Sequence, residues 1–184
     1  MRTYLLKATI FTISIIISVG CTKEKVSQED TLVVGIQGTI FTLDPAMHRD
    51  RTTESVIRNM FDGLVTRDSN MRVVPQLAES WELVDDLTWR FRLRNGVKFH
   101  NGEDFTAEDV FFTIERIIKP NMIDGESSPR KGLLGPVSAV EIEDDFTVLI
   151  KTKEPWPILP VMLPFQEIVP KDYIKEKGSA YFAQ

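Results

Sequence analysis

The sequence predicts an α/β fold, and three stretches carry this prediction. Thr31–Gln37 is a short, nearly continuous apolar run, which is typical of a strand buried on both faces of a sheet. Leu87–Arg94 alternates apolar and polar side chains, as a half-buried antiparallel strand does. Val110–Ile118 has apolar residues at helical spacing, and Pro120 ends this pattern. Strands and helices are therefore both expected along the chain.

Turn and capping signals place the other elements. Thr52 or Thr53 is expected to cap a short helix that Gly63 ends, and Thr106–Asp109 has the pattern of a capping box. Pro170 is expected to open a last helix that closes near Gly178. Further strands are expected at residues 64–67, 73–74, 137–142 and 146–152. Irregular structure is expected in the surface loop 121–136 and in the proline-rich segment 155–164.

The first twenty residues have the character of an export signal. Arg2 and Lys7 make a short basic start, and the uncharged apolar run Ala8–Val19 follows. This run is too short to span a bilayer, which takes roughly 20 residues, but it suits a signal peptide. We expect residues 1–20 to be a signal peptide that is cleaved beside Cys21, and residues 21–30 to be a polar tether.

Cys21 is the only cysteine of the chain, so it cannot form an internal disulfide. The small residues before it resemble the lipobox of bacterial lipoproteins, whose cysteine is acylated and becomes the mature N-terminus. Ser18 departs from that pattern, because leucine is usual at its position. Acyl chains would anchor the protein, since each buried methylene contributes about 0.8 kcal/mol. The alternative is a free or buried thiol behind an uncleaved apolar segment.

Composition and charge restrict the partners. The 184 residues carry 22 basic and 27 acidic side chains, a net charge of −5. Removal of residues 1–20 takes away two of the basic ones and leaves 20 against 27, a net charge of −7. This balance argues against nucleic acid as a partner, because phosphate binding needs a clustered basic surface. Arg90, Arg92 and Arg94 are expected to form one solvated face of a strand.

One block of the sequence, PQLAESWELVDDLTWRFRLRNGVKFHNGEDFTAEDVFFTIERI at residues 75–117, resembles the signature region of the bacterial extracellular solute-binding proteins of family 5. The segments Leu43–Pro45 and Asp62–Val65 also match this family. Asp86 departs from it, since a glycine is common in that turn. The motifs that carry the resemblance inside the block are Ala78–Trp81, Leu93–Arg94, Gly96–His100 and Phe105–Val110.

The resemblance implies a two-lobed α/β fold of the periplasmic-binding-protein-like type II, peptide-binder kind, which closes like a hinge around a solute. Relatives of this family are longer, so the chain would be incomplete: a first-lobe segment plus an extra α+β subdomain. Residues 31–64 would then be the start of the first lobe, residues 65–176 the extra subdomain, and residues 177–184 a truncated return toward the first lobe.

The resemblance also implies a function. We expect a lipid-anchored, monomeric receptor in the cell envelope, at the outer face of the cytoplasmic membrane or in the periplasm. It would capture a peptide-like solute and deliver it to an ABC permease. Two alternatives stay open: a truncated product that transports nothing, and a receptor for a nickel complex, an oligosaccharide or haem.

The best candidates for contacting a solute follow the first predicted strand, because ligands of α/β folds bind beyond the carboxyl ends of strands. The backbone of Gly38, Thr39 and Ile40 can approach an extended solute. A second group of polar residues precedes a predicted helix and could order the polar ends of a ligand: His48, Arg49, Asp50, Arg51 and Thr52. An ordinary solvated loop is an equally good interpretation of both segments.

Metal binding and catalysis find little support in the sequence. A metal site needs several ligands, but His48 and His100 are the only histidines and Cys21 is the only cysteine. Acidic pairs such as Asp85-Asp86 and Asp144-Asp145 lie at predicted turns, with no nucleophile or base beside them. The aromatic residues Trp81, Trp89 and Phe91 are expected to be core residues. We therefore expect no metal, no cofactor and no enzymatic activity.

Overall fold

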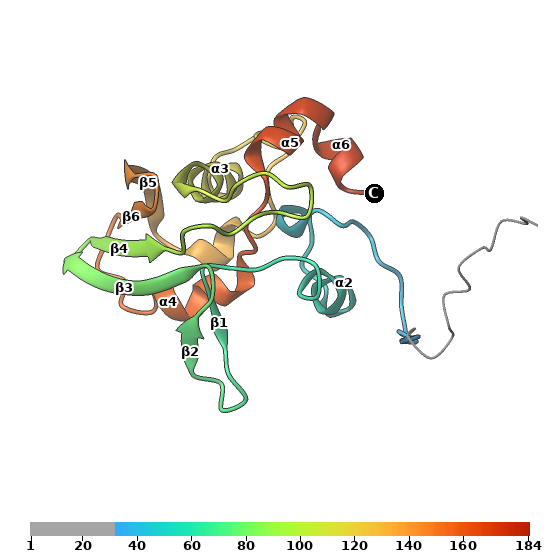
Figure 1. Cartoon of the computed structure of the whole chain (residues 1–184), viewed down its shortest axis with the longest axis horizontal. Coiled ribbons are helices and arrows are strands. Elements are labelled where there is room, and N and C mark those ends of the chain that lie inside the picture. Colours follow the sequence, from blue (N-terminus) through green and yellow to red (C-terminus); the bar gives the residue numbers. More distant parts are fainter. Residues whose placement is uncertain (1–31) are drawn as a thin grey trace, which may run out of the picture. The chain divides into compact units, whose positions relative to one another are not determined.

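A computed structural model describes residues 32–184 of the chain, which divides into a unit ending at Ile36 and a compact unit, Gln37–Gln184 (Figure 1). The predicted strand at 31–37 is wrong for its described part, because residues 32–36 form no strand and Leu32 is 87% exposed. A strand buried on both faces needs neighbouring strands and a cover, and no strand pairs with residues 32–36 in the described chain. The predicted signal peptide, the predicted tether and Cys21 lie outside the described residues.

A four-stranded antiparallel sheet forms one side of the compact unit. Its strand order is β3 (Ala78–Asp85), β4 (Thr88–Leu93), β6 (Thr147–Thr152), β5 (Val137–Asp144). The expected strands at 87–94, 137–142 and 146–152 are thus confirmed within one or two residues. Phe91 lies opposite Trp81 on β3 and opposite Val148 on β6, which fixes the register of the two central strands.

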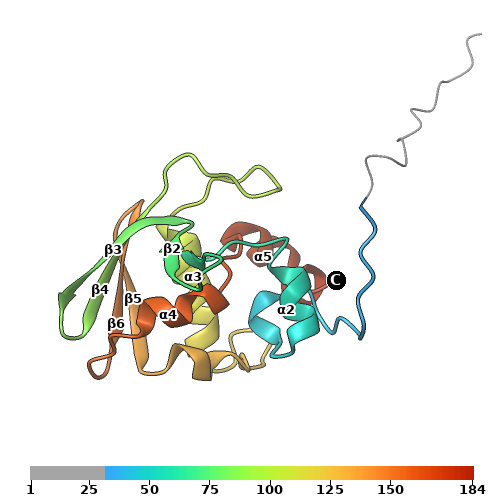
Figure 2. The same ribbon diagram turned by 90° about the horizontal axis from the view of Figure 1, so that it is seen from below.

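Helix α3 (Ala107–Ile118) packs against β5 and β6, and together with α4 (Leu159–Met162) it lies on one face of the sheet (Figure 2). The core forms between these layers. Its central residues are Phe91, Leu93, Val110, Ile114, Ile117, Val140, Val148 and Ile150. Trp81 and Trp89 are half-buried and pack against this core, which agrees with the prediction for the aromatic residues. The opposite face of the sheet carries ion pairs such as Arg90 with Glu143.

The predicted capping box of α3 is confirmed. Thr106 accepts a hydrogen bond from Glu108 N, and the Asp109 carboxylate accepts one from Thr106 N at 2.9 Å. The second oxygen of Asp109 accepts from Lys171 N at 2.9 Å, and so joins the start of α3 to the start of α5 (Lys171–Lys177). Pro170 opens α5 and Gly178 closes it, as expected. A further short helix, α6 (Ser179–Phe182), was not foreseen.

The proline-rich segment 155–164 is more regular than expected. It contains α4, followed by the 3-10 helix η4 (Leu163–Phe165). Proline is tolerated in both because it stands in the first turn, where a backbone N–H would have no carbonyl partner within the helix. Residues 121–136 likewise include a 3-10 helix, η3 (Lys131–Leu134), so this segment is not wholly a surface loop.

The first residues of the compact unit form a 3-10 helix, η2 (Pro45–Met47), and the helix α2 (Arg51–Ile57). The prediction for α2 is wrong at both ends. Its cap is Asp50, whose carboxylate accepts from Thr53 N at 2.8 Å, and its last residue is Ile57 rather than a residue near Gly63. The expected hairpin follows as β1 (Val65–Arg67) and β2 (Val73–Pro75), which projects away from the sheet (Figure 1).

Two phenylalanines test how the core is packed. Phe91→Ala should cost about 3–5 kcal/mol of unfolding free energy, because it empties a buried site between two strands. Phe111 belongs to the apolar stretch of α3 but is 38% exposed, and we expect Phe111→Ala to cost less than about 1 kcal/mol. Urea unfolding of the two variants measures both values. Equal losses would contradict this assignment of the buried face.

Candidate functional site

The two segments proposed to contact a solute lie next to each other. Gly38, Thr39 and Ile40 are exposed, and the Thr52 hydroxyl donates to Gln37 O at 3.5 Å. Gly38 has φ +122°, and a Cβ built there would lie 3.2 Å from Thr52 Oγ1. A glycine is therefore needed at this position both for its backbone angle and for the close approach.

The second segment, His48–Thr52, runs from the residue after η2 into the first turn of α2, and we call it the connection; its five side chains have different roles. The backbone is extended at His48 (φ −133°, ψ 166°) and at Asp50 (φ −97°, ψ 152°). Arg49 and Arg51 are exposed, and no ion pair joins either of them to another residue in the described chain. Asp50 caps α2, and the hydrogen bond from Thr53 N lowers the pKa of the Asp50 carboxyl. Only part of the predicted set is thus free to meet a solute.

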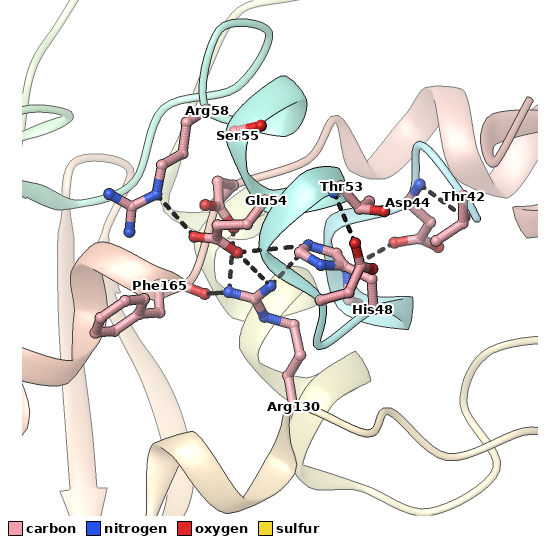
Figure 3. Close-up of polar contacts among 12 residues, drawn as sticks. Thr42, Asp44, His48, Thr53, Glu54, Ser55, Arg58, Arg130 and Phe165 are labelled. Atoms are coloured by element: carbon pink, nitrogen blue, oxygen red, sulfur yellow. Dashed lines mark hydrogen bonds and ion pairs between the residues drawn. The ribbon is translucent and has the colours of Figure 1, made fainter. Parts of the chain in front are cut away.

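His48 is buried, at 3% exposure, beneath this segment. Its Nε2 lies 2.7 Å from an Nη1 of Arg130, and because a guanidinium only donates, the imidazole nitrogen accepts (Figure 3). Burial, together with the charge of Arg130, lowers the pKa of His48 below its ordinary value of 6.5. The side chain is therefore a neutral hydrogen-bond acceptor in the interior. It was expected to order the polar end of a ligand, but in the structure it faces inward and contacts Arg130.

Arg130 is the centre of the buried polar cluster. It is 2% exposed and lies in the connection between α3 and β5. Besides His48, its Nη1 donates to Glu54 Oε2 at 2.8 Å, and its Nη2 donates to the backbone carbonyl of Phe165 (Figure 3). No local sequence signal indicates this role, because Arg130 stands in a segment that is predicted to be a surface loop.

Glu54, on α2, completes the cluster from the other side. It accepts from Arg130 at 2.8 Å and from Arg58 Nε at 2.7 Å. Burial raises the pKa of Glu54, but the hydrogen bonds from Arg130 and Arg58 outweigh it and leave the pKa below 4.5. The carboxylate is therefore charged, and it compensates the buried charge of Arg130.

Glu167 is the least well compensated member of the cluster. It is 3% exposed, and neither of its carboxylate oxygens has a hydrogen-bond partner in the described residues. The nearest cation is Arg130, whose Nη2 lies 3.7 Å from Glu167 Oε2. Burial outweighs the attraction of Arg130 and raises the pKa of Glu167 to about 7.

A second buried ion pair holds the Leu43–Pro45 motif. Arg116, on α3, donates to Asp44 Oδ2 at 2.6 Å, and both side chains are 1% exposed. Asp44 also accepts from Ala46 N at 2.9 Å, which caps η2, and Ser179 on α6 lies 3.3 Å from the same guanidinium. This part of the family-like sequence therefore has a structural role.

A concave site lies elsewhere on the described part of the chain. A pocket of about 590 Å³ is bordered by the turn after α2, the 97–105 hairpin and α5. It includes none of the residues proposed from the sequence. The aromatic residues that line it are Phe61, Phe99, Phe105, Tyr173 and Phe182. His100 also borders it, and no cluster of metal-ligating side chains occurs among residues 32–184. None of the helices in this part of the chain is long and apolar enough to cross a membrane.

Comparison with known proteins shows the family to which this α/β unit belongs. The model of the bacterial extracellular solute-binding proteins, family 5 (middle region), matches residues 72–183. The chain belongs to this family.

Relatives with known names agree with this assignment. The periplasmic oligopeptide-binding protein OppA of Haemophilus influenzae is 31% identical over an alignment of 149 positions, which covers 70% of this chain and 26% of the relative. The glutathione-binding protein GsiB of Salmonella choleraesuis is 33% identical over 126 residues, 68% of this chain and 24% of the relative. The chain thus spans about a quarter of the length of these relatives.

Solved structures show the same fold, the periplasmic-binding-protein-like type II fold. Haemophilus influenzae OppA in complex with the peptide RPPGFSPFR superimposes with a TM-score of 0.68 at 27% identity, over 77% of this chain and 31% of the other. NikZ of Campylobacter jejuni in complex with Ni(L-His) gives a TM-score of 0.65 at 30% identity, over 78% and 28%. The predicted resemblance and the predicted fold class are confirmed.

The raised pKa of Glu167 predicts a pH-dependent stability. Between pH 4.5 and 7 the folded chain keeps a proton on Glu167 that the unfolded chain has lost, so the contribution of this group to stability falls as pH rises. Glu167→Gln removes this loss. Its unfolding free energy relative to the wild type should grow by on the order of 3 kcal/mol over this range.

Urea unfolding at a series of pH values from 4.5 to 7.5 measures this difference. Exposed Glu79→Gln is the matched control, and its curve should run parallel to that of the wild type. Parallel curves for Glu167→Gln and the wild type would contradict the raised pKa of a Glu167 carboxyl that is buried without a hydrogen-bond partner in the described chain.

Proposed function

We propose that this chain forms part of the receptor of an ABC importer, which captures peptides or peptide-like solutes and delivers them to a membrane permease. The observation that carries this proposal is the His48–Thr52 connection, which is extended at His48 and Asp50, exposes Arg49 and Arg51, and is fixed to the body of the protein by the buried Arg130 cluster. Preformed backbone that an extended ligand can approach suits the recognition of peptides.

In this proposal, the two candidate segments meet the solute from one side. Gly38–Ile40 offers exposed backbone, and Arg49 and Arg51 offer exposed cations on either side of the capping residue Asp50. Asp50 and Thr52 contribute by hydrogen-bonding to the backbone of Thr53 and Gln37, and the buried His48 contributes by its contact with Arg130. The family membership and the peptide named in the structure of Haemophilus influenzae OppA support a peptide-like ligand. The receptor works as a monomer at the cell envelope.

A different solute is the second candidate, because NikZ with Ni(L-His) and AgaA with agropinic acid superimpose as well as the peptide receptors do. A nickel complex, an oligosaccharide or haem would then take the place of the peptide. Within residues 32–184 the structure has no cluster that could hold a bare metal ion, so nickel would be bound as a chelate.

Solute binding is tested on the receptor purified from the membranes of its own cell. We expect short peptides to bind with a Kd in the micromolar range or tighter, about −8 kcal/mol or more, while chelated nickel gives no heat in calorimetry. Binding of the nickel chelate alone would replace the peptide with the second candidate. If neither peptides, nickel chelate, oligosaccharide nor haem binds, and the native product has a mass near the 21.0 kDa of this chain, a non-transporting fragment replaces the receptor.

We further propose that Cys21 carries acyl chains after cleavage of residues 1–20. Metabolic labelling with a radioactive fatty acid should label the wild-type protein, and Cys21→Ser should abolish the label and release the protein from the membrane fraction. Cys21 is the only thiol of the chain, so the variant removes no other site. An unlabelled wild-type protein would contradict the anchor and leave the proposed solute binding untouched.

A further inference from the structure

We propose that Arg130 is a positioning residue for solute capture, which holds the His48–Thr52 connection in the conformation that a solute meets. This inference rests on the proposed function, and it assigns a role to a residue that lies 78 positions after Thr52 in the chain. Arg130 itself is 2% exposed and does not reach the surface. It acts through the residues that it contacts.

The guanidinium of Arg130 bridges the two ends of the connection. One nitrogen, Nη1, is 2.7 Å from His48 Nε2, at the start of the connection, and 2.8 Å from Glu54 Oε2, in the first turn of α2 (Figure 3). Because a single planar group makes both contacts, the two ends of the connection keep a fixed separation. The exposed Arg49 and Arg51 lie between these two fixed points.

Arg130 is in turn held by its surroundings. Its backbone N donates to Ser128 Oγ at 3.1 Å, and Ser128 Oγ donates to Ala46 O at 2.5 Å. Its Nη2 donates to the carbonyl of Phe165. The segment between α3 and β5 therefore contacts η2 at Ala46 and the residue after η2 at His48. These contacts leave the guanidinium of Arg130 little freedom to rotate.

The other hydrogen bonds of the connection are weaker constraints. In the described chain, three other side-chain hydrogen bonds involve the connection. Asp50 accepts from Thr53 N within the same turn, and Ser55 Oγ donates to the Thr52 carbonyl. The Thr52 hydroxyl donates to Gln37 O, but this bond is exposed and 3.5 Å long. The buried contacts of Arg130 are charge-assisted and shielded from water, which makes them the stronger ones. Loss of Arg130 therefore frees the connection more than loss of any of these.

The expected consequence is a lower population of the binding conformation. Removal of the guanidinium leaves the Glu54 carboxylate with Arg58 alone and leaves the Phe165 carbonyl without its side-chain donor, so the connection relaxes. The apparent Kd rises in inverse proportion to the fraction of receptor that keeps the binding conformation. A fraction of about one tenth gives a tenfold weaker Kd.

The test compares Arg130→Gln with the wild type in the complete receptor. We expect calorimetry with the bound peptide to give a Kd weakened at least about tenfold. Hydrogen exchange of the amides of residues 48–52, measured without solute, should accelerate by a similar factor. Arg130→Lys, which keeps the charge but not the planar fork, should fall between the two.

Val148→Ala is the matched control, because it removes buried atoms from β6 at a distance from the connection. It should lower stability while Kd and exchange at residues 48–52 stay within about twofold of the wild type. If Arg130→Gln does not fold, Arg130→Lys and Glu54→Gln replace it. Each should weaken binding and speed exchange, and their effects should not add, since both break one contact.

Two results would overturn the inference: unchanged exchange and Kd in the Arg130 variants, or an equal weakening of binding by Val148→Ala, which would make Arg130 merely stabilising. A wild-type receptor that binds no solute would instead refute the proposed function. In that case exchange at residues 48–52 still decides whether Arg130 positions the connection.

Discussion

The buried guanidinium of Arg130 is the interaction on which the candidate site depends. A desolvated cation is tolerated only where partners surround it. Here the partners are His48, which follows η2, Glu54 on α2 and the carbonyl of Phe165 in η4. His48 and Glu54 are near each other in the chain, but Arg130 and Phe165 are distant from them, so the buried charge brings distant segments together. The buried ion pair of Arg116 with Asp44 makes a second such constraint, at the start of η2. Together they fix the exposed connection that we propose meets the solute.

Where local chemistry decides a structure, the sequence predicted it well. The alternation of Trp89, Phe91 and Leu93 identified β4, and Thr106 with Asp109 identified the start of α3. Each signal depends on neighbours within a few residues, so it is legible without the rest of the fold. The family resemblance, carried by residues 75–117, supplied the architecture that local patterns cannot.

Where distant residues decide, the sequence was silent or misleading. Residues 32–36 have the composition of a buried strand, yet they are exposed because pairing depends on other segments. Arg130 is buried by partners 76 to 82 positions earlier in the chain, and nothing near it in sequence indicates this. His48 was predicted to face a ligand from its place before a helix. The same place, combined with the distant Arg130, turns it inward.

A mobile connection would have to be ordered when the solute binds, and this ordering would lower the affinity. A connection held by Arg130 already presents its backbone, Arg49 and Arg51 in the binding conformation. The most direct test of this account is hydrogen exchange of the native receptor with and without its solute. We predict that the bound solute protects the amides of residues 38–40 and 48–52, while those of the exposed β1–β2 turn at residues 68–72 exchange as before. A solute that binds tightly and leaves both candidate segments unprotected would contradict the account.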